Sequence, residues 1–234
     1  MTISIIIPTY NEADNIGKLI PYLFANSNSS VVDIIVSDAG SEDNTIGIAK
    51  QAGANAVLSP RKGRAAQMNF GAGMAKGDVL YFIHADCFPP AKFIEDIQQA
   101  TKMGYNMGRY RTKFDSDKTI LKINAWFTYF DLFICMGGDQ TLFITKSFFE
   151  QCKGFRDDMM IMEEFEFCKR ASKLGRCKIL NGEALVSARK YDTNSWLRVQ
   201  LANFKMLRMY KKGAAQQEML DTYKQMLSYR KNAF

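Results

Sequence analysis

Continuous apolar runs alternate with helix-spaced apolar residues along the first hundred positions of the chain. Residues 3–7 read Ile-Ser-Ile-Ile-Ile, which is typical of a strand in a parallel sheet covered on both faces. Pro8 ends this strand. The next segment predicts an amphipathic helix, because five apolar residues follow the i, i+3, i+4, i+7, i+8 spacing: Ile16, Leu19, Ile20, Leu23 and Phe24.

The same alternation continues to residue 102. It predicts strands over 31–36, 56–58 and 78–83, and helices over 41–52 (capped by Ser41), 64–76 and 90–102. Strands that alternate with helices indicate a parallel sheet, in which ligands bind beyond the carboxyl ends of the strands. Three polar segments fall at those ends and are expected to converge on one crevice: Pro8–Glu12, Asp38–Ser41 and His84–Asp86.

The pattern changes after Gly104. Strands are predicted over 109–114, 141–144 and 176–187, and helices over 120–135, 161–174, 195–210 and 216–229. The predicted fold class is α/β, a mixed and mostly parallel sheet flanked by helices, with a C-terminal helical tail. We divide it into a strand–helix alternating part (1–104), a part with a changed pattern (105–191) and a helical extension (192–234).

Net charge is concentrated in the C-terminal tail. Residues 189–234 hold ten Lys or Arg and three Asp or Glu, a net charge of +7 that equals that of all 234 residues. No nucleic-acid-binding module is recognisable there, and Leu201, Phe204 and Leu207 are expected to be packing residues, so we predict no nucleic-acid partner. Two interpretations stay open: the helices pack on the rest of the chain with a solvated charged face, or the basic and aromatic tail contacts an anionic membrane surface.

The five cysteines form no Cys-x-x-Cys pair and the chain has one histidine, which argues against a zinc site and favours free thiols in a reducing compartment. The first residues resemble a buried strand more than a signal peptide. No apolar stretch reaches the length of a spanning helix. The predicted location is therefore cytoplasmic. If the tail contacts a membrane, the protein is expected at the inner membrane surface.

Seven short motifs together resemble the family-2 glycosyltransferases of the GT-A fold. They are IIIPTYNE (5–12), VSDAGSEDNT (36–45), GRAAQMNFGA (63–72), HAD (84–86), GGDQTLF (137–143), MEEFEFCKR (162–170) and SARKY (187–191). The resemblance spans roughly residues 3 to 191, and it implies one glycosyltransferase domain over 1–191 with a nucleotide-binding half (1–104) and an acceptor and catalytic half (105–191). It is closest to a bacterial subgroup labelled arsenosugar-biosynthesis or radical-SAM-selenodomain-associated glycosyltransferases. It implies an inverting enzyme of the hexosyltransferase type that moves a sugar from a nucleotide-diphospho-sugar, with UDP as the default, to an unknown small-molecule or lipid-linked acceptor.

The resemblance also implies donor-binding roles. Pro8 and Tyr10 would flank the base, and Glu12 would accept hydrogen bonds from the ribose diol. Asp38 would accept from the ring N–H of the base, and Arg64 would lie beside the base and diphosphate. The competing interpretation is structural: a strand, a turn and a helix start at Pro8–Glu12, a turn-capping Asp38 and a surface Arg64.

His84-Ala85-Asp86 is a variant of the Asp-x-Asp signature of the family. Asp86 stands at the metal-binding position, where a Mg²⁺ or Mn²⁺ ion would neutralise the diphosphate leaving group. His84 replaces the first aspartate, which approaches the ribose, and it brings no negative charge when neutral. Weaker metal binding than at a site with two carboxylates is the expected consequence.

The catalytic base is the second chemical need of an inverting transferase. The family supplies it as the aspartate of a Glu-Asp pair, and this chain has Glu163-Glu164 there, so Glu164 is the expected base. Asp139 is the second candidate, although its expected role is to line the acceptor pocket. In the competing interpretation, both glutamates only offset a helix dipole.

Two other functions are compatible with the same α/β layout and compete with a glycosyltransferase. A nucleotidyltransferase shares the α/β layout, but the N-terminal motif lacks the expected Gly-rich phosphate loop and lysine. A degenerate binding protein of the same fold, which binds nucleotide sugars without catalysis, is the main alternative, since His84 and Glu164 depart from the family pattern.

Overall fold

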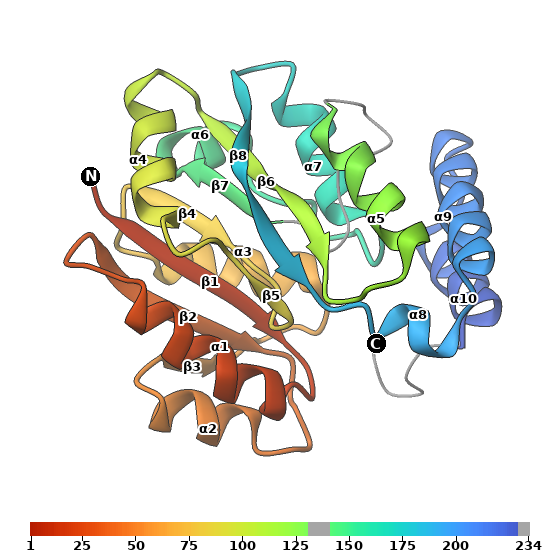
Figure 1. Ribbon diagram of the computed structural model, residues 1–234, viewed down its shortest axis with the longest axis horizontal. Helices are drawn as coiled ribbons and strands as arrows, with labels where there is room; N and C mark the ends of the chain where they lie inside the picture. Colours follow the sequence, from red (N-terminus) through yellow and green to blue (C-terminus); the bar gives the residue numbers. More distant parts are fainter. Residues whose placement is uncertain (131–140, 229–234) are drawn as a thin grey trace.

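The computed structural model describes residues 1–130 and 141–228, which form an eight-stranded sheet in the order β3-β2-β1-β4-β7-β6-β8-β5, flanked by helices (Figure 1). The strands are β1 Ile3–Thr9, β2 Val31–Asp38, β3 Asn55–Leu58, β4 Val79–Phe82, β5 Cys87–Phe88, β6 Met107–Phe114, β7 Leu142–Thr145 and β8 Cys177–Val186. The helices are α1 Ala13–Ala25, α2 Thr45–Gln51, α3 Arg64–Met74, α4 Phe93–Lys102, α5 Thr119–Trp126, the 3₁₀ turn η1 Phe127–Tyr129, α6 Lys146–Gln151, α7 Glu163–Ala171, α8 Lys190–Thr193, α9 Trp196–Lys211 and α10 Gln216–Met226.

The first half of the sheet is parallel and the second half is mixed. β1 pairs in parallel with β2 and β4, and β2 pairs in parallel with β3. β7 is antiparallel to both β4 and β6, whereas β6 and β8 are parallel. The predicted fold class is therefore confirmed, including the C-terminal helices.

Two hydrophobic layers cover the sheet. Ile5 and Ile7 of β1 pack into the layer that contains α1 and α4, and Ile6 packs into the opposite layer with α3. Each buried isoleucine contributes about 1.5–3 kcal/mol to folding relative to an exposed one. Gly71 lets α3 approach closely, because a Cβ there would lie 2.6 Å from Ile6 Cγ2. This contact anchors the helix that begins with Arg64.

A short antiparallel pair brings the end of β8 to the carboxyl end of β4. Cys87 of β5 pairs with Val186 of β8, and the Ser187 N–H donates to the Asp86 carbonyl at 3.1 Å. The SARKY segment therefore passes directly beside His84–Asp86, although a hundred positions separate the two motifs.

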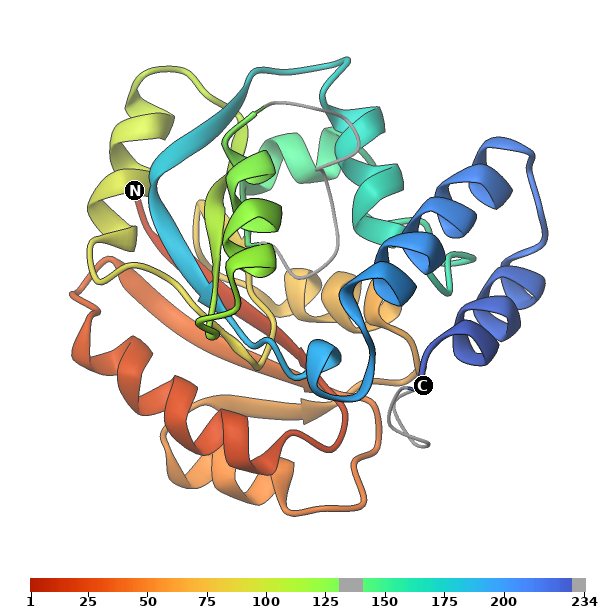
Figure 2. The same ribbon diagram turned by 45° about the vertical axis from the view of Figure 1, so that its right-hand side comes forward.

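The C-terminal helices α9 and α10 lie side by side at the end of the molecule away from α1 and α2 (Figures 1 and 2). The packed face of α9 contains Val199, Ala202, Met206 and Met209. Leu201 and Phe204 were expected to be packing residues, and that prediction is wrong: their exposed fractions are 53% and 64%. None of the helices over the described ranges is long and apolar enough to cross a membrane.

Some local predictions need correction. The helix expected from Ser41 begins at Thr45 with Asn44 at the N-cap position, because Ser41 instead bonds to Asp38 and Asn11. The helix expected over 120–135 ends at Trp126 and continues as the η1 turn, and its last residues fall outside the described ranges. The short elements β5, α6 and α8 were not foreseen.

Candidate active site

Glu12, Asp86 and Arg189 meet at the carboxyl ends of β1, β4 and β8. Arg189 donates from Nη1 to Glu12 Oε2 at 2.9 Å and from Nη2 to Glu12 Oε1 at 2.7 Å. The same Nη2 lies 2.8 Å from Asp86 Oδ2. All three side chains are mostly buried, so a single guanidinium bridges the two carboxylates predicted for the ribose and the metal.

His84 and Glu164 form a second contact at this edge of the sheet. His84 Nε2 lies 3.1 Å from Glu164 Oε1, and both side chains are largely buried. These residues are the two departures from the family pattern seen in the sequence. The fold brings them together from 80 positions apart.

Glu163 points to a different partner from that of Glu164. Its Oε1 lies 2.7 Å from Arg64 Nε, and the Glu163 side chain is only 2% exposed. Burial raises the pKa of the Glu163 carboxyl above its ordinary value, while the Arg64 charge acts in the opposite direction. The pair therefore joins the start of α3 to the start of α7.

Two residues with positive φ directly precede Glu12 and Glu163. Asn11 has φ +54°, directly before Glu12, and Met162 has φ +64° and ψ +22° at the N-cap of α7, directly before Glu163. Asparagine tolerates this left-handed region, but methionine enters it at a cost. Glu163, Glu164 and Glu166 then fill the first turn of α7, where negative charge is favoured by the helix dipole.

The remaining residues predicted to bind the donor base lie at the carboxyl ends of β1 and β2 or directly after them. Asp38 is fully buried and accepts four hydrogen bonds: from Thr9 Oγ1, the Gly40 and Ser41 N–H groups, and Ser41 Oγ. These bonds are those of the structural interpretation, and contact with a base stays a prediction. Pro8 is buried in β1, and the Lys62 ammonium lies 5.5 Å from the Tyr10 ring centroid.

Asp139, the second candidate base, lies outside the described residues. Arg189 is the residue for which sequence reasoning gave no role, although the SARKY motif contains it. A signal existed, because an arginine in a matched motif is a natural partner for carboxylate or phosphate groups.

The site holds four carboxyl groups (Glu12, Asp86, Glu163 and Glu164) and two guanidinium groups (Arg64 and Arg189). Within residues 1–130 and 141–228, however, no three His, Cys, Asp or Glu side chains cluster as ligands. Mg²⁺ is commonly bound by one or two carboxylates together with substrate phosphates. Asp86 stands at the position predicted for such a metal, and that role stays a prediction.

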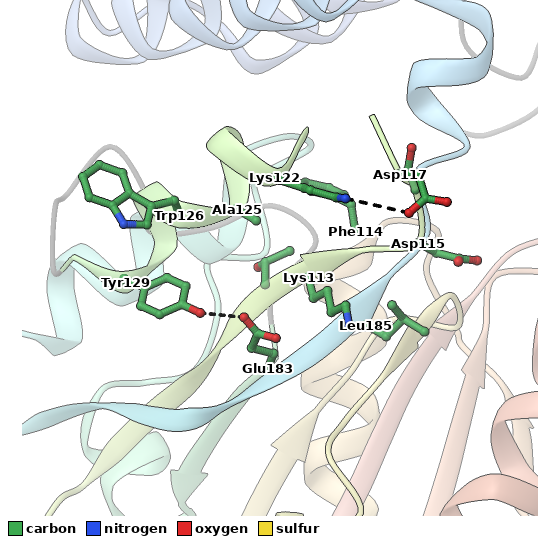
Figure 3. Close-up of a pocket in the computed structure, with 12 residues that line it drawn as sticks. Lys113, Phe114, Asp115, Asp117, Lys122, Ala125, Trp126, Tyr129, Glu183 and Leu185 are labelled. Atoms are coloured by element: carbon green, nitrogen blue, oxygen red, sulfur yellow. Dashed lines mark hydrogen bonds and ion pairs between the residues drawn. The ribbon is translucent and has the colours of Figure 1, made fainter. Parts of the chain in front are cut away.

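A groove of about 780 Å³ lies between α5, the end of β6 and β8 (Figure 3). Trp126 and Tyr129 lie along one side, and the Tyr129 hydroxyl donates to Glu183 Oε1 at 2.6 Å. At the end of β6 the Asp115 N–H donates to the Val186 carbonyl of β8. The groove belongs to the half of the chain predicted to bind the acceptor.

The chain is similar in sequence to known glycosyltransferases. The model of the family described as "Glycosyl transferase family 2" matches residues 4–180. The glycosyltransferase AglE of Haloferax volcanii is 32% identical over 100 residues, which cover 40% of this chain and 33% of AglE. Glucosyl-3-phosphoglycerate synthase of Mycolicibacterium paratuberculosis is 32% identical over 99 residues, 38% of this chain and 30% of that protein. The matches thus span about a third of the length of these relatives.

Solved structures show the same fold at low identity. The mannosyltransferase PcManGT of Pyrobaculum calidifontis, in complex with GDP-Man and Mn²⁺, superposes with a TM-score of 0.71 at 13% identity, over 96% of this chain and 69% of that one. Glucosyl-3-phosphoglycerate synthase of Mycobacterium tuberculosis, with Mn²⁺, UDP and phosphoglyceric acid, gives a TM-score of 0.62 at 15% identity, over 98% and 79% of the two chains.

Proposed function

The chain belongs to glycosyl transferase family 2, whose model matches well over half of it, and from this membership we propose that it transfers a sugar from a nucleotide-diphospho-sugar to an acceptor with inversion. The observation that carries the proposal is the convergence of Glu12, Asp86, His84 and Glu164 at one edge of the sheet. Membership of the arsenosugar-labelled subgroup stays a prediction, as does the cytoplasmic location.

We propose that the donor lies along the carboxyl ends of β1, β2 and β4. Pro8, Tyr10 and Asp38 would bind the base and Glu12 the ribose hydroxyls. Arg64 would lie beside the base and diphosphate, and His84 beside the ribose. Support comes from the strand topology, because Pro8, Tyr10, Glu12, Asp38 and His84 lie at or just after the carboxyl ends of β1, β2 and β4, the edge where ligands of parallel sheets bind.

Asp86 would hold a Mg²⁺ or Mn²⁺ ion together with the diphosphate of the donor, and that ion would supply charge neutralisation for the leaving group. Support comes from the carboxyl groups at the site and from relatives of the same fold solved with Mn²⁺. The ion would have to share Asp86 with the guanidinium of Arg189.

Glu164 would act as general base. As the acceptor oxygen forms its bond to the anomeric carbon, the hydroxyl proton passes to a Glu164 oxygen. The bond from the anomeric carbon to the diphosphate oxygen breaks, and the nucleoside diphosphate leaves. The contact with His84 holds the Glu164 carboxylate at the end of β4.

The first test of this function measures whether the chain binds a nucleotide-sugar donor. A thermal-shift panel of UDP-, GDP- and dTDP-sugars with Mn²⁺ or Mg²⁺ is expected to raise the melting temperature with one nucleotide class, because a ligand that binds only the folded state stabilises it. A ligand at about 100 times its Kd contributes about 2.7 kcal/mol. No shift with any donor would contradict the proposal. Binding without any hydrolysis of the donor would favour the degenerate binding protein.

We also propose that α9 rests on an anionic membrane surface. Three apolar side chains one helical turn apart are exposed on it: Leu197 (60%), Leu201 (53%) and Phe204 (64%). Exposed basic residues flank this stripe, including Arg198, Lys205 and Arg208. Basic side chains near an anionic leaflet contribute about 1 kcal/mol each, so the charge and the apolar stripe together suit this partner.

Liposome flotation tests the membrane contact. The protein is expected to float with phosphatidylglycerol vesicles at low salt, to be released by high salt, and not to float with phosphatidylcholine vesicles. A double variant, Leu201→Gln with Phe204→Gln, changes exposed side chains only and is expected to reduce flotation several-fold. Failure of the unchanged protein to float at low salt would end the membrane hypothesis and leave the tail a structural element.

A further inference from the structure

The guanidinium of Arg189 lies between the two carboxylates of Glu12 and Asp86. One nitrogen of its guanidinium, Nη2, lies 2.7 Å from a Glu12 oxygen and 2.8 Å from an Asp86 oxygen. Under the proposed function, on which this inference rests, Glu12 binds the ribose and Asp86 faces the diphosphate. The guanidinium therefore lies at the junction of ribose and diphosphate.

The charges at this junction call for a cation. A diphosphate that approaches Glu12 and Asp86 would meet two carboxylates of its own sign, and like charges at close range in a partly buried site repel strongly. The guanidinium of Arg189 already neutralises part of that charge. Its planar fork also matches phosphate oxygens as well as carboxylates.

The anchoring of Arg189 allows such an exchange of partners. It follows β8 by three positions and precedes the short helix α8, with its N–H bonded to Ser187 Oγ at 3.3 Å. The side chain is 26% exposed, so it is partly accessible to solvent. An incoming phosphate can therefore take over hydrogen bonds that Glu12 and Asp86 now accept.

We propose that Arg189 is a diphosphate-binding residue, which holds Glu12 and Asp86 in place before the donor arrives and pairs with the donor phosphates afterwards. The same contact makes the guanidinium a competitor of a divalent cation for Asp86. A divalent cation is then expected to bind weakly on its own, and to bind more tightly when a nucleoside diphosphate is present to pair with Arg189.

A purely structural role makes a different prediction. If Arg189 only fixes Glu12, its loss weakens nucleoside and nucleoside diphosphate equally, because both carry the ribose. If it binds the diphosphate, its loss weakens the nucleoside diphosphate alone. Comparison of the two ligands therefore separates the interpretations.

The experiment measures UDP, uridine, GDP and guanosine binding by calorimetry, and free Mn²⁺ binding by electron paramagnetic resonance. It compares the unchanged chain with Arg189→Met, Arg189→Lys and the control Arg176→Met. Arg176 directly precedes β8 and lies at the opposite end of that strand, so its replacement removes the same charge away from the site. Melting temperatures check that each variant is folded.

For Arg189→Met we expect the affinity for the preferred nucleoside diphosphate to fall about 10–100-fold, with the matching nucleoside changed less than about twofold, as for loss of a charged bidentate pair. Free Mn²⁺ is expected to bind several-fold more tightly, because Asp86 loses its guanidinium. Lysine keeps the charge without the fork and is expected to restore part of the diphosphate affinity.

Equal losses for nucleoside and nucleoside diphosphate, or an unchanged diphosphate affinity in Arg189→Met, would overturn the inference while leaving the proposed function standing. Unchanged Mn²⁺ binding in that variant would overturn the competition at Asp86. If the unchanged chain binds neither UDP nor GDP, with or without Mn²⁺, the proposed function fails first and the role of Arg189 fails with it.

Discussion

Replacement of Glu164 by glutamine is expected to slow sugar transfer by about 10²–10⁴-fold, the usual contribution of a positioned proton acceptor. Glutamine keeps the shape of the side chain but cannot take the acceptor proton. Donor binding is expected to persist, because glutamine can still hydrogen-bond to His84 and position 164 is separate from the network of Glu12, Asp86 and Arg189. Single-turnover transfer and donor calorimetry measure the two effects separately.

Glu163→Gln is the matched control for that variant. Glu163 is the neighbouring carboxylate, but it is buried against Arg64, so its replacement is expected to reduce stability or donor affinity more than the transfer step. Near-normal turnover in Glu164→Gln would contradict the assignment and move the base to Glu163 or Asp139.

Replacement of Asp86 by alanine is expected to remove the gain in donor affinity that Mn²⁺ or Mg²⁺ gives. Under the proposed function, Asp86 is the carboxylate that shares a cation with the donor diphosphate. The fold is expected to stay intact, because Arg189 keeps its bidentate partner Glu12 and the backbone bond from Ser187 to the Asp86 carbonyl does not depend on the side chain.

Calorimetry of UDP binding with and without Mn²⁺ tests this expectation. Asp117→Ala is the control, since Asp117 is an exposed carboxylate that lies 3.8 Å from the Lys122 ammonium, and its loss is expected to leave the metal effect unchanged. Mn²⁺-assisted binding that is the same in Asp86→Ala as in the unchanged chain would show that the metal assignment is wrong. Circular dichroism confirms the folded state.

The local pattern was enough to predict the first half of the fold. Buried parallel strands are continuous apolar runs, so β1, β2 and β4 were identified near their true bounds, and the carboxyl ends of parallel strands necessarily share one edge. Short elements were missed, because β5 has two residues and α6 has six, too few for a hydrophobic period to be visible. The exposure of Leu201 and Phe204 was also missed, because apolar spacing identifies a face of a helix but does not show whether another element covers it.

The sequence alone determined which chemical groups stand at the ends of the strands, since the strand pattern and the motifs are both local. Only the tertiary structure decided which of these groups meet. Arg189 contacts Glu12 across 177 positions because β8 pairs with β6 and β5 and so returns the chain to the end of β4. His84 contacts Glu164 because α7 begins at that same edge. Such long-range pairings depend on how strands and helices pack, and the hydrophobic periodicity of local segments does not contain that information.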